Sequence, residues 1–300
     1  MRNMVTLTVF TPTYNRAYCL HRGYEALCRQ TSKDFKWIVV DDGSTDNTRG
    51  LVEKWQQADN GFEIQYIYKE NGGLYTGYNV AIAAADTELC VCVDSDDYLT
   101  DDAVEKAVFF WRAHGSERYA GVIGLDCLES GEILGDPFPE QESINLIDLL
   151  LGKYPIRNAD RKNVVRTDLY KKFAPMKEFP GEKDLNPHFL HIQISKTHDF
   201  LVLNEKLCVV EYQLDGMTNT IFKQYLRSPR SFREMRLMDL SLEGASFKFY
   251  AKKMIHYVAS CILAKEPCIS ASPKKMLTVA MYPFGVLMTV YLIYYNKRKP

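Results

Sequence analysis

The chain has 300 residues, with 37 lysines and arginines, 38 aspartates and glutamates, and a net charge of −1. This length suffices for one large α/β domain or two small ones, and the near-neutral charge excludes a general electrostatic attraction to nucleic acid. A composition of 46% hydrophobic and 25% charged residues excludes a disordered chain. The eight cysteines form no CxxC pair, which argues against a zinc site and is typical of free thiols in a reducing compartment.

Strand and helix patterns alternate from the N-terminus. Short β-branched or fully apolar runs predict strands, and longer runs with apolar residues three or four positions apart predict helices. The predicted strands cover residues 5–11, 37–40, 64–68, 89–93, 119–125 and 200–212, and the predicted helices cover residues 17–30, 45–59, 79–85 and 100–114. Short strands separated by helices predict a mostly parallel sheet, whose ligand binds at the carboxyl ends of the strands.

The second half of the chain has a different pattern. Residues 131–181 are mixed and loop-rich, and from about residue 224 the chain is helical, first basic and then apolar. We therefore predict a first domain over residues 1–222, with halves of about 1–100 and 101–222, and a helical region over residues 223–300.

Asp94-Ser95-Asp96-Asp97 directly follows the apolar run LCVCV and is the strongest chemical signal. Three carboxylates at a strand end repel one another, and a divalent cation relieves that repulsion. Magnesium or manganese bound by Asp94 and Asp96 would keep positions open for phosphate oxygens. The alternative is a solvated acidic turn before a helix, where carboxylates also favour the helix dipole.

A second acidic pair, Asp41-Asp42, ends the strand before Gly43 and Ser44. At the same edge of the sheet, Asp42 can accept a hydrogen bond from the ring N–H of a base such as uracil. The alternative is an ordinary strand–turn–helix junction, in which Ser44, Thr45 or Asp46 caps the helix.

Two further segments lie near these acidic residues in the predicted fold. FTPTYNRAYCL (10–20) places Pro12 at a strand exit and Tyr14 where its ring can lie against a base. ENGGLYTGYN (70–79) has Gly72 and Gly73, which permit close backbone approach to a ligand. A buried aromatic residue and an ordinary glycine turn are the respective alternatives.

In this order and spacing, the four segments resemble the family 2 glycosyltransferases, which have the GT-A nucleotide-sugar fold. The likeness spans residues 7–97 and resumes at 166–168, 179–183 and 211–216. It implies an α/β fold with a Rossmann-like sheet flanked by helices, a donor half and an acceptor half before residue 222, and a helical C-terminal extension. It also implies inverting transfer from a nucleoside-diphosphate sugar, most simply a UDP-sugar, to a glycan or lipid-linked acceptor in cell-surface polysaccharide synthesis.

The resemblance implies roles for single residues. Pro12, Thr13 and Tyr14 would frame the base, and Asp42 would bind it with Asp41 beside it. Asp94 and Ser95 would reach the ribose, and Asp96 with Asp94 would hold Mn²⁺ or Mg²⁺. The donor site would be completed by Gly72, Gly73 and Asn79. Many relatives place a basic residue before this Asn, whereas Gly77 and Tyr78 stand here.

The catalytic base is predicted less directly. Inverting transfer needs a carboxylate that takes the proton of the acceptor hydroxyl. Many relatives have a Glu-Asp pair at this point, whereas this chain has Glu182-Lys183-Asp184. We assign Glu182 as the base and Asp184 as the next candidate. The departure leaves open a non-catalytic nucleotide-sugar-binding homologue. A nucleotidyltransferase is a further alternative, but TPTYNRAY lacks the glycine-rich phosphate loop of that class.

The C-terminal tail suggests a membrane. Residues 276–296 carry no charge and lie between Lys274-Lys275 and Lys297-Arg298-Lys299. This run is long enough to span a bilayer, but with Pro283 and Gly285 inside it a bent helix pair at the membrane surface is an equal alternative. A C-terminal helix packed against the catalytic domain is the third. Arg227, Arg230, Arg233 and Arg236 recur every third residue, which predicts a basic ridge on one helix, either solvated or facing an anionic partner. With no signal-peptide layout at its start, the protein is expected in the cytoplasm at the inner face of the membrane.

Overall fold

The computed structural model describes residues 5–211 and 220–298, which form two compact units. The first unit comprises Met1–Asn71, Thr76–Met176 and Leu190–Gln213, and the second comprises Gly72–Tyr75, Lys177–Phe189 and Leu214–Pro300. Both units are discontinuous along the chain, in contrast to the single division at residue 222 that the sequence suggested. The donor-half residues from 5 to 71 and the predicted base therefore belong to different units.

The first unit contains a nine-stranded sheet in the order β3-β2-β1-β4-β8-β6-β9-β5, with β7 paired to β9. Strands β3, β2, β1 and β4 are mutually parallel, and β8 joins β4 and β6 in antiparallel pairing. The strands are β1 Leu7–Thr13, β2 Phe35–Asp41, β3 Glu63–Tyr68, β4 Leu89–Cys92, β5 Tyr98–Leu99, β6 Tyr119–Cys127, β7 Ser143–Ile144, β8 Arg161–Arg166 and β9 Asp199–Val209.

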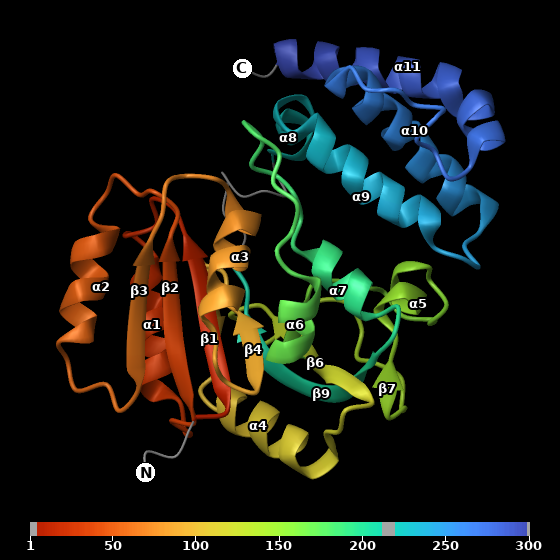
Figure 1. Cartoon of the computed structure of the whole chain (residues 1–300). Coiled ribbons are helices and arrows are strands. Elements are labelled where there is room, and N and C mark those ends of the chain that lie inside the picture. The colour runs from red at the N-terminus through yellow and green to blue at the C-terminus, as the bar shows by residue number, and fades with distance from the viewer. Residues whose placement is uncertain (1–4, 212–219, 299–300) are drawn as a thin grey trace. The chain divides into compact units, whose positions relative to one another are not determined.

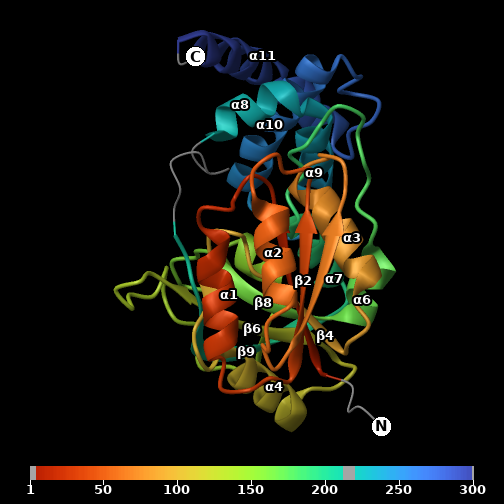
Figure 2. The same ribbon diagram turned by 90° about the vertical axis from the view of Figure 1, so that its left-hand side faces the viewer.

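Helices cover both faces of the parallel part of this sheet (Figures 1 and 2). Val9 and Trp37 share a buried apolar cluster with residues of α1, α2 and α4, whereas Phe10 on the opposite face contacts Tyr78 of α3 and Tyr170 of α6. This two-sided burial confirms the predicted α/β class. The helices are α1 Leu20–Arg29, α2 Thr48–Gln56, α3 Leu74–Ala84, α4 Ala103–His114, α5 Leu146–Leu150, α6 Thr167–Phe173 and α7 His188–Ile194.

The predicted elements correspond to observed ones, with shifts at their ends. Helix α3 starts at Leu74 rather than residue 79, and α4 starts at Ala103 rather than residue 100. The strands β5, β7 and β8 and the helices α5, α6 and α7 were not predicted, because they have at most seven residues each and show little period.

The second unit carries the helices α8 Ile221–Arg227, α9 Pro229–Ser241, α10 Phe247–Ala264 and α11 Lys275–Arg298. Within this unit α10 lies between α9 and α11 (Figure 1). The predicted bent helix pair is wrong: α11 is one helix with Pro283 inside it.

The predicted basic ridge on a single helix is also wrong. Arg227 ends α8 and the other three arginines lie in α9, because Pro229 begins a new helix. Each of the four guanidinium groups pairs with a carboxylate of the same unit, so the arginines do not form a solvated row. The pairs are Arg227–Asp184, Arg230–Glu182, Arg233–Glu266 and Arg236–Asp239.

Candidate functional site

The loops after β1 and β2 are fastened together at the carboxyl edge of the sheet. Asn15, at a positive φ of 53°, accepts a hydrogen bond at Oδ1 from the Thr45 backbone N–H at 2.8 Å. Its own N–H donates to Ser44 Oγ at 2.9 Å, and the Ala17 N–H donates to Asp46 Oδ2 at 2.9 Å. The β1 loop, which carries Tyr14, is thus held in register with the loop that follows Asp42.

Asp41 and Asp42 are both buried but have different partners. Asp41 accepts from the Ser44 N–H at 2.7 Å and from the Tyr66 hydroxyl at 2.6 Å, so both carboxylate oxygens organise the turn. Asp42 Oδ1 accepts from the Lys69 ammonium at 2.6 Å. The residue predicted to bind the base is therefore oriented by a cation from the end of β3.

Gly43 shapes this turn. Its φ is 82°, and a Cβ at this position would lie 2.9 Å from the Asn71 backbone nitrogen. The Asn71 side chain in turn donates to the Asp42 carbonyl oxygen at 2.8 Å. Only glycine allows the β2 turn and the segment after β3 to approach this closely.

The acidic loop, defined as Asp94 to Asp97, follows β4 at the same edge of the sheet. Asp94 is exposed, Asp96 is half-buried and Asp97 is buried. Burial and the neighbouring Asp94 charge raise the pKa of Asp96. Burial also raises the pKa of Asp97 to about 8. Asp97 accepts from the Glu211 N–H at 3.1 Å, so it faces the protein. The loop thus divides into an outer pair, Asp94 and Asp96, and an inner carboxyl.

Buried charges of β6 and β8 interact with this loop. Lys162 and Asp126 are each at most 7% exposed. Although burial lowers the pKa of the Lys162 ammonium, the carboxylates of Asp126, Asp97 and Asp94 raise it well above its usual value. Burial raises the pKa of Asp126 to about 6 despite the opposing effect of Lys162. One ammonium therefore interacts with three carboxyl groups, those of Asp126, Asp97 and Asp94.

The outer pair of the acidic loop fits a divalent cation that also takes ligand oxygens. Magnesium is usually held by one or two carboxylates together with phosphates and water. Asp94 and Asp96 would supply two carboxylates from one loop, the first exposed and the second half-buried. Among the described residues, no three His, Cys, Asp or Glu side chains could hold a metal ion by themselves.

The other predicted donor residues of the first unit lie around the end of β1. Pro12 is buried, and a Cβ on Gly77 would lie 2.9 Å from its Cβ. Thr13 is buried, and its hydroxyl has no hydrogen-bond partner among the described residues. Tyr14 is 49% exposed. Tyr14 therefore keeps an exposed ring for a ligand, whereas the Thr13 hydroxyl is closed off from solvent.

Asn79 and its neighbours have strong internal contacts. The Asn79 amide donates to the Met176 carbonyl at 3.0 Å and accepts from the Met176 N–H at 2.8 Å. Tyr78 is buried against Phe10, with ring centroids 5.0 Å apart. The absence of a basic residue before Asn79 has a local explanation, since Gly77 and Tyr78 fill space beside β1.

In the second unit, Gly73 packs closely against the backbone of Lys183. Its φ is 96°, and a Cβ would lie 2.2 Å from the Lys183 carbonyl oxygen. The Tyr75 hydroxyl bridges the same segment, accepting from the Phe179 N–H at 3.4 Å and donating to the Glu182 carbonyl at 3.3 Å. The glycine pair therefore packs residues 72–75 against residues 179–183, and its predicted contact with the donor stays a prediction.

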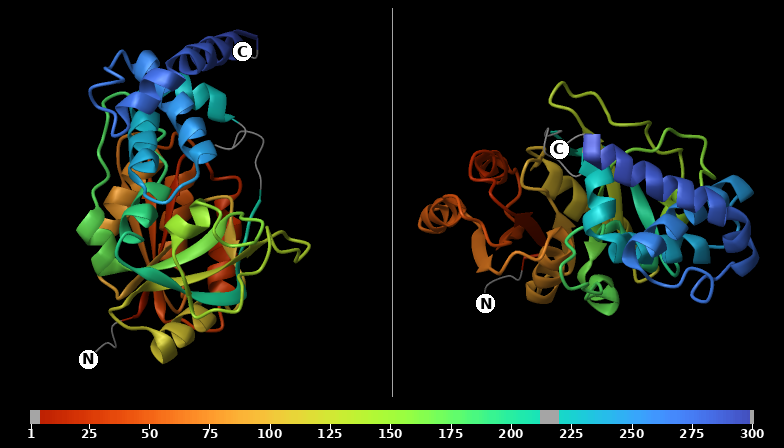
Figure 3. Two further views of the ribbon diagram at one scale, coloured as in Figure 1. Left: turned by 90° about the vertical axis from the view of Figure 1, so that its right-hand side faces the viewer. Right: turned by 90° about the horizontal axis from the view of Figure 1, so that it is seen from above.

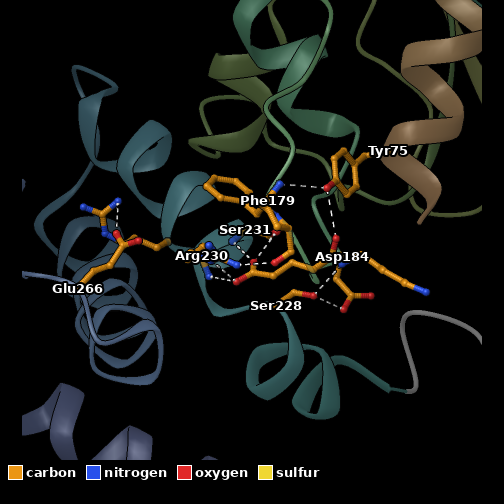
Figure 4. Close-up of polar contacts among 11 residues, drawn as sticks. Tyr75, Phe179, Asp184, Ser228, Arg230, Ser231 and Glu266 are labelled. Carbon is orange, nitrogen blue, oxygen red and sulfur yellow. Dashed lines mark hydrogen bonds and ion pairs between the residues drawn. The ribbon is translucent and has the colours of Figure 1, made fainter. Parts of the chain in front are cut away.

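Glu182, the predicted base, caps helix α9 through Arg230 and Ser231, which Figure 4 labels. Its Oε1 accepts from the Arg230 N–H at 3.0 Å and from Arg230 Nε at 2.9 Å. Its Oε2 accepts from the Ser231 N–H at 2.7 Å and from Ser231 Oγ at 2.8 Å. A carboxylate offers about four acceptor sites, and four donors occupy them here. This capping role was not predicted, and the role as base stays a prediction.

Asp184 lies in the same network. Arg227 binds both of its oxygens, from Nε and Nη2 at 2.5 Å each, and Ser228 Oγ donates at 2.7 Å. The Ser228 oxygen also accepts from the Lys183 N–H at 3.1 Å. Both carboxylates of Glu182-Lys183-Asp184 thus hold the junction between α8 and α9 (Figure 4).

The family model described as Glycosyl transferase family 2 matches residues 8–168, more than half of the chain. The chain belongs to this family. The match contains the β1 loop, the Asp41-Asp42 turn and the acidic loop, so the predicted resemblance is confirmed.

Two curated bacterial glycosyltransferases are similar to this chain in sequence. A GalNAc(5)-diNAcBac-PP-undecaprenol beta-1,3-glucosyltransferase of Campylobacter jejuni is 25% identical over 262 residues, which cover 85% of this chain and 81% of the relative. The poly(ribitol-phosphate) beta-N-acetylglucosaminyltransferase TarS of Staphylococcus aureus is 33% identical over 116 residues, which cover 38% of this chain and only 20% of TarS.

Solved structures share the fold. TarS residues 1–349 in complex with UDP-GlcNAc give a TM-score of 0.64 at 16% identity, covering 98% of this chain and 92% of TarS 1–349. The mannosyltransferase PcManGT of Pyrobaculum calidifontis, in complex with GDP-Man and Mn²⁺, gives 0.57 at 16% identity, covering 97% and 88%. These likenesses confirm the GT-A fold predicted for this glycosyltransferase.

Sequence reasoning missed three cationic residues near the carboxyl edge of the first unit. Lys69 pairs with Asp42, and Arg22 pairs with Glu211. The charges of Arg16 and Arg22 both lower the pKa of Asp96. Their positions in the sequence could have indicated them, since Lys69 directly follows β3 and Arg16 lies in the loop after β1. Residues 212–216 of the predicted family segment lie outside the described residues.

Proposed function

We propose that this glycosyltransferase transfers a sugar, with inversion, from a UDP-sugar to a glycan or lipid-linked acceptor in cell-surface polysaccharide synthesis. The observation that carries the proposal is the arrangement at one edge of the sheet. Three features follow parallel strands of the first unit: the exposed ring of Tyr14 after β1, the oriented carboxylate of Asp42 after β2, and the acidic loop after β4.

The arrangement suits a uracil nucleotide. The Asp42 carboxylate can accept the imide N–H of uracil, and cytosine has no such hydrogen at that ring position. Lys69 occupies Oδ1 and holds the carboxylate in one orientation. The TarS structure with UDP-GlcNAc supports this choice of donor, and the relatives acting on undecaprenol-linked and poly(ribitol-phosphate) acceptors support the class of acceptor.

Asp94 and Asp96 would hold Mn²⁺ or Mg²⁺ in this proposal, with Ser95 and Asp94 close to the ribose. When bound, the ion would neutralise the diphosphate leaving group. The protein contributes the two outer carboxylates and keeps Asp97 turned inward. PcManGT, whose structure contains Mn²⁺, supports a metal in this fold.

The base in this proposal is Glu182, with Asp184 as the second candidate. To take a proton, Glu182 must release one of its four donors. The Ser231 hydroxyl is the most easily released, because it can rotate about its own bond. The saturated network also favours one alternative, a homologue that binds the donor without transferring the sugar.

Two measurements test the proposal. A thermal-shift panel of UDP, GDP, CDP and dTDP with and without Mn²⁺ should single out UDP with metal, because ligand binding to the native state raises its stability. Sugar transfer to membrane extracts containing lipid-linked glycans then separates the enzyme from a non-catalytic binder. Preference for another nucleotide would refute the donor assignment, and binding without transfer would favour the binder.

The proposed location is the inner face of the cytoplasmic membrane, with peripheral contact through the C-terminal tail. Helix α11 is long and apolar enough to cross a membrane, with a mean hydropathy of 1.8 over its most apolar window. A lipid-linked acceptor would place the reaction at such a surface.

A further inference from the structure

Helix α11 lacks the polar outer face expected for a helix in water. Its buried residues are Thr278, Gly285, Thr289 and Leu292. Its exposed side chains are large and apolar, including Met276, Val279, Phe284, Leu287, Val290 and Tyr294. A surface helix of a soluble protein turns its apolar face inward and its polar face to solvent. A large exposed apolar face of this kind marks an interaction surface.

The inner face of α11 is closely fitted to the second unit. A Cβ on Gly285 would lie 2.4 Å from Val258 of α10, so the two helices touch at their backbones. Thr278 Oγ1 bonds to Ser272 Oγ at 2.7 Å and contacts Met254 Sδ of α10 at 3.3 Å. Near the other end, Asn296 donates to the Phe222 carbonyl of α8 at 2.9 Å. Contacts at both ends and the middle hold α11 along its whole length.

We propose that α11 lies in the plane of an anionic membrane surface, with its outer face in the lipid and its inner face still packed on α10. This inference specifies the membrane contact of the proposed function, and rests on that function only for the choice of leaflet. Figure 3 shows that, within the second unit, no other helix covers α11 when the molecule is seen from above.

Crossing the bilayer would cost the contacts of the inner face. Helix α11 would have to leave α10, which would uncover Met254 and Val258, both 0% exposed. Helix α10 cannot follow it into the lipid, because Lys252, Lys253 and His256 lie in its middle. A helix that lies in the interface keeps the inner contacts and buries only the outer face.

The basic residues at both ends of α11 favour an anionic membrane surface, rather than a second copy of the chain, as the partner of its outer face. Lys274 and Lys275 precede or begin α11, Lys297 and Arg298 end it, and the helix contains no acidic residue. In the plane of the membrane both basic ends meet anionic headgroups at once. A second copy of the chain would instead bring four cations of each helix against those of the other. Tyr282, Tyr291 and Tyr294 on the exposed side suit the headgroup boundary.

Vesicle sedimentation tests the outer face. The full-length protein should bind vesicles of phosphatidylcholine with phosphatidylglycerol and bind phosphatidylcholine alone much more weakly. The triple variant Val279→Glu, Leu287→Glu, Val290→Glu should lose at least tenfold in affinity. The matched control is Phe109→Glu, which changes a side chain that is 73% exposed on α4 and should bind as wild type. The proposal would be overturned if the triple variant bound vesicles as tightly as the wild type, or if the wild type formed dimers and did not bind vesicles.

Cysteine labelling separates the in-plane helix from a spanning one and needs no change to the outer face. Ala271→Cys and Lys297→Cys are made singly, with the exposed Cys28 replaced by serine. A membrane-impermeant maleimide added outside sealed vesicles should label both positions to the same extent. Protection of one end until detergent is added would establish a spanning helix and overturn the proposal.

The donor chemistry is measured on the same variants in the absence of lipid. Outer-face variants should keep the UDP-dependent thermal shift of the wild type. Vesicle binding without any nucleotide response would refute the proposed function and leave this inference standing, whereas a nucleotide response without vesicle binding would do the reverse.

Discussion

The two units each carry a conspicuous group of carboxylates, and their surroundings are opposite. In the acidic loop of the first unit, Asp94, Asp96 and Asp97 are grouped at a strand end, and the pKa values of the last two are raised. In the second unit, Glu182 and Asp184 each accept hydrogen bonds from an arginine and a serine hydroxyl, and Glu182 also accepts from two backbone N–H groups. The cations near the acidic loop do not offset the effect of burial on Asp96 and Asp97, whereas each carboxylate of the second unit pairs directly with an arginine.

This difference indicates what each group is prepared to do. Carboxylates with excess negative charge gain from a cation brought by a ligand, and Asp94 and Asp96 are accessible to one. Glu182 accepts four hydrogen bonds and Asp184 three, around the start of α9, so both already stabilise the fold. The acidic loop is thus suited to binding, and Glu182-Lys183-Asp184 to holding α8 and α9, unless a bound acceptor displaces a donor.

The largest effect is expected from Asp96→Ala. It removes a carboxylate that would hold the metal, so metal-dependent donor binding and sugar transfer should both fall below detection. The unfolding midpoint without metal should be unchanged or higher, since a like-charge repulsion is removed. Thermal shift with UDP and Mn²⁺ measures this, with Asp59→Asn on an exposed segment as control. A full metal-dependent shift in Asp96→Ala would exclude Asp96 as a ligand.

Glu182→Gln tests whether the saturated group also does chemistry. A general base contributes about 10²–10⁴-fold to turnover, so turnover should fall by that factor while donor affinity is kept. Glutamine still offers an oxygen to the α9 N-terminus, which limits the loss of stability. Asp184→Asn is the parallel variant for the second candidate.

The outcome that contradicts this prediction is equally informative. Near-normal turnover per folded molecule, together with a lower unfolding midpoint, would restrict Glu182 to capping α9. Rescue of stability by a shorter carboxylate, in Glu182→Asp, without recovery of turnover would instead keep the catalytic assignment.

The sequence predicted the acidic loop well, because its evidence is local. Asp94 to Asp97 directly follow an apolar strand, and parallel strands place their carboxyl ends at one edge. It could not predict the environment of Glu182, because Arg230 and Ser231 lie 48 and 49 positions away in the chain. The regular spacing of the four arginines suggested one helix, and Pro229 divides them between two.

Lys69 and Lys162 were missed for the same reason. Each is an ordinary lysine at a strand end or inside a strand, and only the sheet brings it near Asp42 or Asp126. The apolar outer face of α11 was not predicted either, since residues 276–296 are apolar all round and the sequence does not indicate which side packs on α10.

The buried charges of the first unit predict a pH dependence that Asp126→Asn should alter. The folded pKa of Asp126, about 6, exceeds its unfolded value near 3.8. Between these values the native state holds more protons than the unfolded state, so stability falls as pH rises from about 4 to 6. Asparagine cannot ionise. The free energy of unfolding of the variant should therefore rise relative to that of the wild type between pH 4 and pH 6, by at most about 3 kcal/mol. Urea unfolding of the metal-free proteins at pH 4, 5, 6 and 7 measures both free energies, and a difference between them that does not change with pH would contradict the raised pKa of Asp126.

The smallest effect is expected from Lys69→Met. This substitution changes the surroundings of Asp42, which are intermediate between those of the acidic loop and those of Glu182. Asp42 is buried like Glu182 but pairs with the ammonium of Lys69 at 2.6 Å. Removing the cation frees Asp42 to turn, which should weaken UDP binding by about tenfold, or 1.4 kcal/mol, with little effect on CDP. Preference for UDP over CDP, measured by calorimetry with Mn²⁺, should narrow accordingly. Lys54→Met, on the exposed side of α2, is the matched control and should keep the wild-type preference. If Lys69→Met weakens UDP and CDP equally, Lys69 acts on the diphosphate or on the fold rather than through the base contact of Asp42.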